Sequence, residues 1–185
     1  MTPQIRILCL GNEILADDAF GLAAAEELRQ RFPDMEVVFT SEAGFHLIDY
    51  LSDADLLVVV DSIQTTNVPP GTVLVFRNAD IKSHFGPSPH YVGLFETLQL
   101  ARKLLLPVPE EVIILAVEAV DCMTLGGEMH AAVKSAVGPV VELVQEIARC
   151  WKLTDAEHDG NPAHDLEHAL AAVSARCGPD RFAVI

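Results

Sequence analysis

The sequence predicts an α/β fold: a three-layer α/β/α sandwich around a five-stranded, mostly parallel sheet with one antiparallel edge strand. Strand-like and helix-like segments alternate along the chain, which is typical of a sheet covered by helices. Residues 56–60 are apolar at every position, as in a parallel strand buried on both faces. Half of the 185 residues are apolar, enough for the core of one domain.

The first third of the chain predicts three strands separated by helices. Residues 5–11 form a strand-like run typical of a buried strand, and residues 20–32 have the Ala, Leu and Glu pattern of a helix. Residues 35–40 alternate as a second strand. Residues 46–52 predict a short helix before the third strand at residues 55–61. This order predicts parallel neighbours in the sheet.

A short link then changes the direction of the chain. Only nine residues, 62–70, follow the third strand, whereas a parallel crossover usually needs a dozen or more. Residues 72–77 therefore predict an antiparallel edge strand. The remaining predicted elements are a helix, a fifth strand and a long closing helix that bends at Gly138 and Pro139, over residues 92–106, 112–120 and 128–153.

The end of the chain differs in composition. Acidic residues mix with His158, His164 and His168 before an Ala-rich helix pattern at residues 165–176. We expect one α/β domain over residues 1–153 and an acidic, His-containing C-terminal tail over residues 154–185, partly helical or mobile. The histidines leave metal binding by the tail open as an alternative.

The charge balance argues against several partners. The chain has 12 basic and 27 acidic residues, a net charge of −15, and no basic cluster that could neutralise phosphates. We therefore expect neither nucleic acid nor an anionic membrane as a partner. No apolar run approaches the ~20 residues that span a bilayer, and the first residues lead directly into a strand. These features predict a cytoplasmic protein.

The cysteines predict neither a disulfide framework nor a nucleophile. No CxxC pair occurs among Cys9, Cys122, Cys150 and Cys177. Buried small hydrophobes or tail thiols explain them more simply than a catalytic cysteine.

Three residues far apart in sequence are predicted to meet at one edge of the sheet. Asp18 follows the first strand, and Asp61 ends the third. His90 lies in a Gly/Pro-rich loop before a helix; if the fourth strand runs antiparallel, this loop returns to the carboxyl edge of the sheet. Ligands of open α/β sheets bind at that edge.

Each member of this trio also has a simpler interpretation. One carboxylate of the Asp17-Asp18 pair can cap the helix that follows. We expect Asp17 to cap and Asp18 to face the cleft. Asp61 could cap the next loop through Ser62, and His90 could be a solvated loop residue.

Together, two carboxylates and an imidazole suit divalent nickel, zinc, manganese or iron. A structural zinc site would need four ligands, usually including thiolates. With three ligands, one coordination position stays open.

No dinucleotide-binding GxGxxG motif is present, so we expect no organic cofactor site.

The sequence resembles the nickel–iron hydrogenase maturation endopeptidases from residue 5 to about residue 150. Three motifs in order carry the resemblance: Gly11-Asn12-x-x-Leu15-x-Asp17-Asp18-x-x-Gly21, Val58-Val59-Val60-Asp61-Ser62 and His90-x-x-Gly93-Leu94-x-Glu96-x-Leu98.

The resemblance implies a cytoplasmic peptidase, with residues 1–153 as the peptidase domain. Its partner would be a hydrogenase large-subunit precursor, whose C-terminal extension it removes after nickel insertion. The nickel, supplied by the substrate, would be contacted by Asp18, Asp61 and His90, with weak binding of other divalent metals also expected. Asp18 and Asp61 would be catalytic through a metal-assisted attack of water, and Asp18 is the first candidate for the general base.

Two departures from the family pattern and two alternatives remain. Residues 40–44 lack the paired glycines of many relatives, and the end of the fifth strand keeps Glu118 but lacks a proline.

A non-catalytic nickel chaperone would need the same three ligands as the peptidase. A receiver-like signalling domain also carries acids at these strand ends, but it needs a lysine after the fifth strand, and residues 120–124 contain none.

Overall fold

The computed structural model describes residues 4–77, 91–157, 162–177 and 181–184. The strands are β1 (Ile5–Leu10), β2 (Glu36–Thr40), β3 (Leu56–Ile63), β4 (Val73–Arg77), β5 (Glu111–Glu118) and β6 (Phe182–Val184). The helical elements are the 3-10 segments η1 (Asp17–Ala19) and η2 (Gly44–Tyr50) and the α-helices α1 (Phe20–Arg31), α2 (Tyr91–Lys103), α3 (Ala131–Lys134), α4 (Val137–Glu157) and α5 (Pro162–Cys177).

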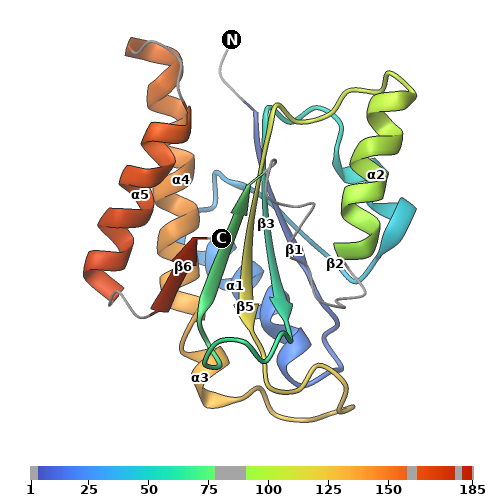
Figure 1. Ribbon diagram of the computed structural model, residues 1–185, viewed down its shortest axis with the longest axis vertical. Helices are drawn as coiled ribbons and strands as arrows, with labels where there is room; N and C mark the ends of the chain where they lie inside the picture. Colours follow the sequence, from blue (N-terminus) through green and yellow to red (C-terminus); the bar gives the residue numbers. More distant parts are fainter. Residues whose placement is uncertain (1–3, 78–90, 158–161, 178–180, 185) are drawn as a thin grey trace.

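The strands form a sheet in the order β2-β1-β3-β5-β4-β6 (Figure 1). Strand β4 is antiparallel to β5, and the other pairs are parallel. The predicted mostly parallel α/β fold with an antiparallel strand is therefore confirmed. The sheet has six strands rather than five, because β6 pairs with β4 and moves it away from the edge. With only three residues, β6 is too short to show a strand pattern in the sequence.

Helices cover both faces of the sheet, as expected for strands that are apolar on both sides (Figure 1). In β1, Ile7 and Cys9 belong to the core that packs against α1 and α4. Leu8 and Leu10 belong to the opposite core, against η2 and α2. This alternation follows from the two-residue period of a strand. All eight residues of β3 are buried, which makes it the central strand of both cores.

The C-terminal elements lie beside α4. Helix α5 packs against α4, and Val173 is fully buried in the same core as α1. Strand β6 then joins the sheet. The division into residues 1–153 and 154–185 stays a prediction. In the part of the chain that the structure describes, no helix is both long and apolar enough to cross a membrane.

Candidate active site

A tight turn after β1 positions Asp18. A Cβ atom on Gly11 would overlap the backbone carbonyl oxygen of Asp18, and one on Gly21 would overlap that of Leu10. The backbone N–H of Asn12 donates to the same Asp18 carbonyl at 3.1 Å. Two glycines thus let the start of the helix fold directly onto the end of β1. The consequence is a buried Asp18 at the carboxyl edge of the sheet.

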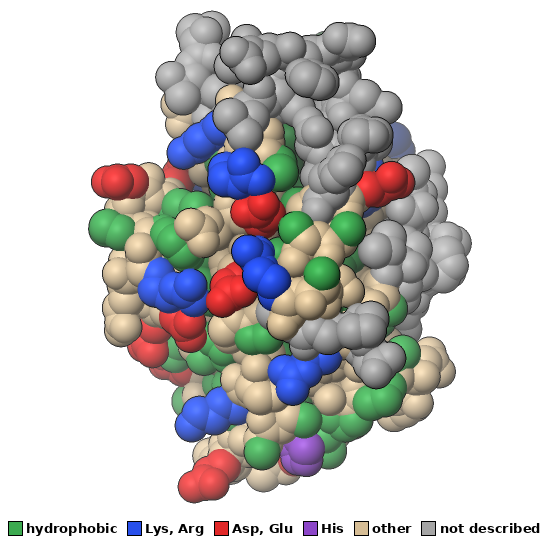
Figure 2. Space-filling view, turned by 90° about the vertical axis from the view of Figure 1, so that its left-hand side faces the viewer, with side chains coloured by type: hydrophobic (Ala, Val, Ile, Leu, Met, Phe, Trp, Pro, Cys, Tyr) green, Lys and Arg blue, Asp and Glu red, His purple; other side chains and the backbone are tan. Residues whose placement is uncertain are grey.

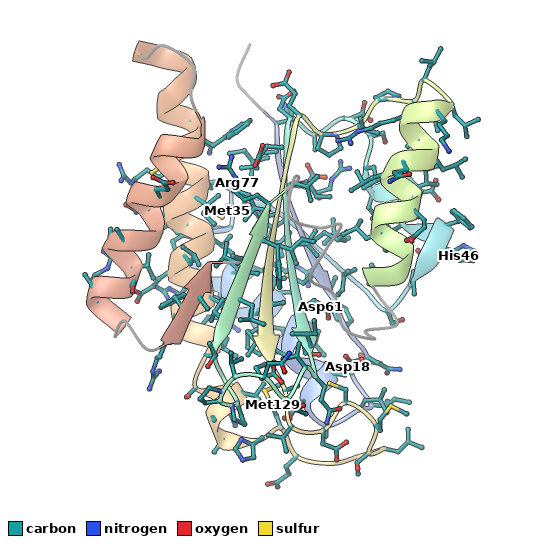
Figure 3. The ribbon with its side chains drawn as sticks, in the orientation of Figure 1. Asp18, Met35, His46, Asp61, Arg77 and Met129 are labelled. Atoms are coloured by element: carbon teal, nitrogen blue, oxygen red, sulfur yellow. The ribbon has the colours of Figure 1, made fainter. Side chains whose placement is uncertain are left out.

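Asp61 lies on the neighbouring strand, and Ser62 connects it to Asp18. Asp61 is fully buried, and the backbone N–H of Ser62 donates to its Oδ1 at 2.7 Å. The Ser62 hydroxyl donates to Oδ1 of Asp18 at 2.9 Å. Strand β3 extends to Ile63, so Asp61 lies within the strand and not at its end as predicted. Figure 3 shows Asp18 and Asp61 close together near the carboxyl ends of the strands.

Asp17 has a different role from the one predicted. Its carboxylate accepts hydrogen bonds from three backbone N–H groups: Val120 at 2.8 Å, Asp121 at 2.9 Å and His130 at 2.6 Å. The prediction that Asp17 caps its own helix is therefore wrong. The segment after β5 leaves the sheet and needs acceptors for its N–H groups, and the buried Asp17 supplies them. Asp17 ties this segment to the turn that carries Asp18.

The segment after β5 also brings a thiol to the two acids. The Sγ atom of Cys122 lies 3.6 Å from the Ser62 hydroxyl oxygen. Burial, together with the negative charges of Asp18, Asp17 and Asp61, raises the pKa of the Cys122 thiol to about 11, against the lowering effect of the Ser62 hydrogen bond. Cys122 is therefore a thiol, not a thiolate, at neutral pH.

Glu118 fixes the loop that follows β3 at the carboxyl edge of the sheet. It is buried at the end of β5, and its Oε1 accepts from the backbone N–H groups of Thr65 at 2.8 Å and Thr66 at 2.7 Å. Its Oε2 accepts from the Thr65 hydroxyl at 2.6 Å. Thr66 has a left-handed φ of 62°, a conformation that these hydrogen bonds hold. Glu118 thus shapes the loop that follows Asp61 and Ser62.

The third predicted ligand, His90, lies outside the described residues. Helix α2 begins at the next residue, Tyr91. Within residues 4–77, 91–157, 162–177 and 181–184, no group of three or more His, Cys, Asp or Glu residues could hold a metal ion. His46 lies away from the two acids, on η2 (Figure 3). The Nδ1 of His130 accepts from the N–H of Ala132 at 3.3 Å and so caps α3.

Two of the three predicted ligands are thus brought together, and they are chemically suited to a divalent cation. The carboxylates of Asp18 and Asp61 are buried and share Ser62 as a hydrogen-bond donor. Carboxylate oxygens are suitable ligands for borderline and hard divalent metals. The sequence prediction missed the connecting role of Ser62 and the position of Cys122. The edge rule that located the acids also applies to Cys122, since this residue follows β5 at the same edge.

A family model described as "Hydrogenase maturation protease" matches residues 22–147. The chain belongs to the hydrogenase maturation protease family. The matched stretch includes Asp61 and begins just after the turn that carries Asp18. Members of this family are peptidases, which excludes the receiver-like alternative.

Individual members of the family match over most of the chain. A "Hydrogenase expression/formation protein HupD" from Thiocapsa roseopersicina is 28% identical over an alignment of 193 positions, which covers 96% of this chain and 85% of that protein. The "Hydrogenase 2 maturation protease" of Escherichia coli K12 is 33% identical over 104 residues, covering 54% of this chain and 63% of that protein.

Solved structures of hydrogenase maturation proteases have the same fold. The HybD protease from Thermococcus kodakarensis has a TM-score of 0.64 at 28% identity, covering 78% of this chain and 99% of that one. The HybD endopeptidase from E. coli has a TM-score of 0.63 at 24% identity, covering 95% of this chain and 94% of that one. The second likeness bears on the fold alone.

Proposed function

We propose that this chain is a cytoplasmic endopeptidase that removes the C-terminal extension of a hydrogenase large-subunit precursor. The nickel already inserted in the precursor serves for recognition. Membership of the protease family supports the reaction class and implies a hydrogenase large-subunit substrate. The observation that carries the site is the pair of buried carboxylates, Asp18 and Asp61, oriented by one residue, Ser62.

In this proposal Asp18, Asp61 and His90 contact the nickel of the substrate. Asp18 would supply a carboxylate oxygen from η1, after β1, and Asp61 one from β3. His90 would add an imidazole nitrogen from the residue before α2. Three protein ligands leave room for the precursor's own groups on the metal. A divalent metal at such a site polarises a carbonyl group or lowers the pKa of a water molecule.

The protein's own residues would orient the substrate and move the proton. The Ser62 hydroxyl fixes one oxygen of Asp18, which holds this carboxylate in one orientation. Asp18 is our candidate for the general base that takes a proton from the attacking water, and Asp61 is the second catalytic carboxylate. Cys122 is disfavoured as a nucleophile because its thiol pKa is about 11.

Mass spectrometry of a precursor tests this proposal directly. A hydrogenase large-subunit precursor from the same source, with and without nickel, would be incubated with the protein. Loss of a C-terminal peptide only from the nickel-loaded precursor is the expected result. A precursor of unchanged mass that still binds the protein would contradict the peptidase proposal and favour the nickel chaperone.

A further inference from the structure

Four large apolar side chains are exposed around the two acids. Their exposed fractions are 55% for Ile14, 41% for Val120, 80% for Met123 and 71% for Leu125. They come from the turn after β1 and from the segment after β5. We call these four residues the apolar rim. In Figure 1 the strands β1, β3 and β5 end in the lower part of the molecule. Figure 2 shows several hydrophobic side chains at the surface of this lower part.

The two segments of the apolar rim form one small antiparallel ribbon. Leu15 and Leu125 make an antiparallel bridge. The N–H of Ala16 donates to the carbonyl of Thr124 at 3.0 Å, and the N–H of Gly126 donates to the carbonyl of Ile14 at 2.8 Å. Backbone pairing therefore holds the exposed side chains on a common support.

The ribbon is attached to the neighbours of the two acids, Asp17 and Ser62. Asp17 accepts from the N–H groups of Val120 and Asp121, and Cys122 contacts the Ser62 hydroxyl that donates to Asp18. The carboxylate of Asp121 accepts from the N–H groups of Met123 at 2.9 Å and Thr124 at 3.0 Å, which closes the loop. The ribbon therefore adjoins the position that a scissile bond at Asp18 would occupy.

The apolar rim is suited to a binding partner, and the net charge of the chain argues against a second copy as that partner. Clustered exposed apolar side chains mark interaction sites, and methionine adapts its shape to a partner. A second copy of this chain is disfavoured, because each copy has a net charge of −15 and the copies repel each other. A polypeptide substrate must reach the carboxylates beside the rim in every turnover.

We propose that the apolar rim binds an apolar stretch of the precursor polypeptide next to the scissile bond. This inference rests on the proposed function and adds the chemistry of the substrate segment. The rim acts in binding, and the acids act on the bond. Apolar truncation should therefore weaken binding of the precursor and leave the chemical step nearly unchanged.

The test compares a triple variant at the rim with a control at the opposite edge. Ile14→Ser, Met123→Ser and Leu125→Ser are combined in one protein. The control combines Leu104→Ser and Leu105→Ser, two exposed leucines that follow α2 at the amino edge of the sheet. Since all five side chains are exposed, both proteins should unfold at nearly the same urea concentration as the parent.

Processing of the nickel-loaded precursor is measured over a range of precursor concentrations. We expect the rim variant to raise KM at least about tenfold, the factor for losing burial of even one large apolar side chain, with kcat nearly unchanged. The control should keep both constants. A rim variant with the KM of the parent would overturn the inference. So would a parent that is dimeric in sedimentation and becomes monomeric with the rim variant.

A binding measurement separates this inference from the proposed function. The same rim substitutions are placed in Asp61→Asn, and the Kd for the precursor is measured. If the parent does not cut, the proposed function fails, while a Kd raised about tenfold by the rim substitutions would still support the rim. If the parent cuts and the Kd is unchanged, only the rim inference fails.

Discussion

The hydroxyl of Ser62 donates a 2.9 Å hydrogen bond to Oδ1 of Asp18, across 44 residues of sequence. The backbone N–H of the same serine donates to Oδ1 of Asp61 at 2.7 Å. One residue of β3 thus orients two carboxylates, one from η1 and one from its own strand. This arrangement gives the candidate site its geometry before any substrate binds.

Removing the Ser62 hydroxyl should impair processing without unfolding the protein. A hydrogen bond to a charged group contributes about 1.5–3 kcal/mol, so Ser62→Ala should lower kcat by roughly 10- to 100-fold. Ser62→Thr keeps the hydroxyl and should retain more activity than Ser62→Ala. Steady-state processing of the precursor measures both. Equal activity of Ser62→Ala and the parent would show that the hydrogen bond to Asp18 does not matter.

The adjacent acids Asp17 and Asp18 should respond differently to substitution. Asp17→Ala removes the acceptor of three backbone N–H groups and should lower the free energy of unfolding by about 3 kcal/mol. Asp18→Asn keeps an oxygen that can accept from Ser62 and should change stability by about 1 kcal/mol or less. Urea unfolding measures the free energy of unfolding of both variants. A larger loss of stability for Asp18→Asn than for Asp17→Ala would reverse these roles.

The contact between the turn and β1 should tolerate no side chain at Gly21. A Cβ atom there would overlap the carbonyl oxygen of Leu10, so Gly21→Ala should destabilise the protein by about 2 kcal/mol or more. Gly138→Ala is the matched control, because a Cβ atom at Gly138 has no neighbour within 4 Å. Thermal unfolding compares the two. Similar melting temperatures for both variants would contradict the tight turn.

The reactivity of Cys122 should report the charge of the neighbouring acids. Because its pKa is raised to about 11, alkylation by iodoacetamide should be slow at pH 8 and should accelerate as the pH rises toward 11. Asp18→Asn removes a negative charge that raises this pKa, so alkylation of Cys122 at pH 8 should become faster. Peptide mass spectrometry follows the modification, with the exposed Asp34→Asn as control. An equal rate of Cys122 alkylation in Asp18→Asn and in the control would contradict the proximity of the Cys122 thiol to the Asp18 carboxylate.

The sequence was sufficient to predict the main body of the fold. The fully apolar run of β3 predicted a strand covered on both faces, and all its residues are buried. The short link after β3 predicted an antiparallel β4, and β4 is antiparallel to β5. The closing helix instead forms two helices, α3 and α4. Gly138 and Pro139 lie in the first turn of α4, where proline is tolerated, rather than at a bend.

The site was predictable only where it depends on the ends of strands. Topology placed Asp18 and Asp61 at one edge, and a single residue, Ser62, contacts both carboxylates. The partners of Asp17 lie 103 to 113 residues away, and the Ser62–Cys122 contact spans 60 residues. No local pattern records such contacts, because they depend on how the segment after β5 packs. His90 stays a prediction.

The most direct measurement compares cleavage by the two acid variants. Asp18→Asn, Asp61→Asn and the control Asp34→Asn are incubated separately with nickel-loaded precursor, and the precursor mass is followed over time. Urea unfolding of each variant confirms that it is folded. We predict that Asp34→Asn releases the C-terminal peptide at the rate of the parent, whereas the other two release none. Release at the parent's rate by folded Asp18→Asn or Asp61→Asn would contradict the proposed site.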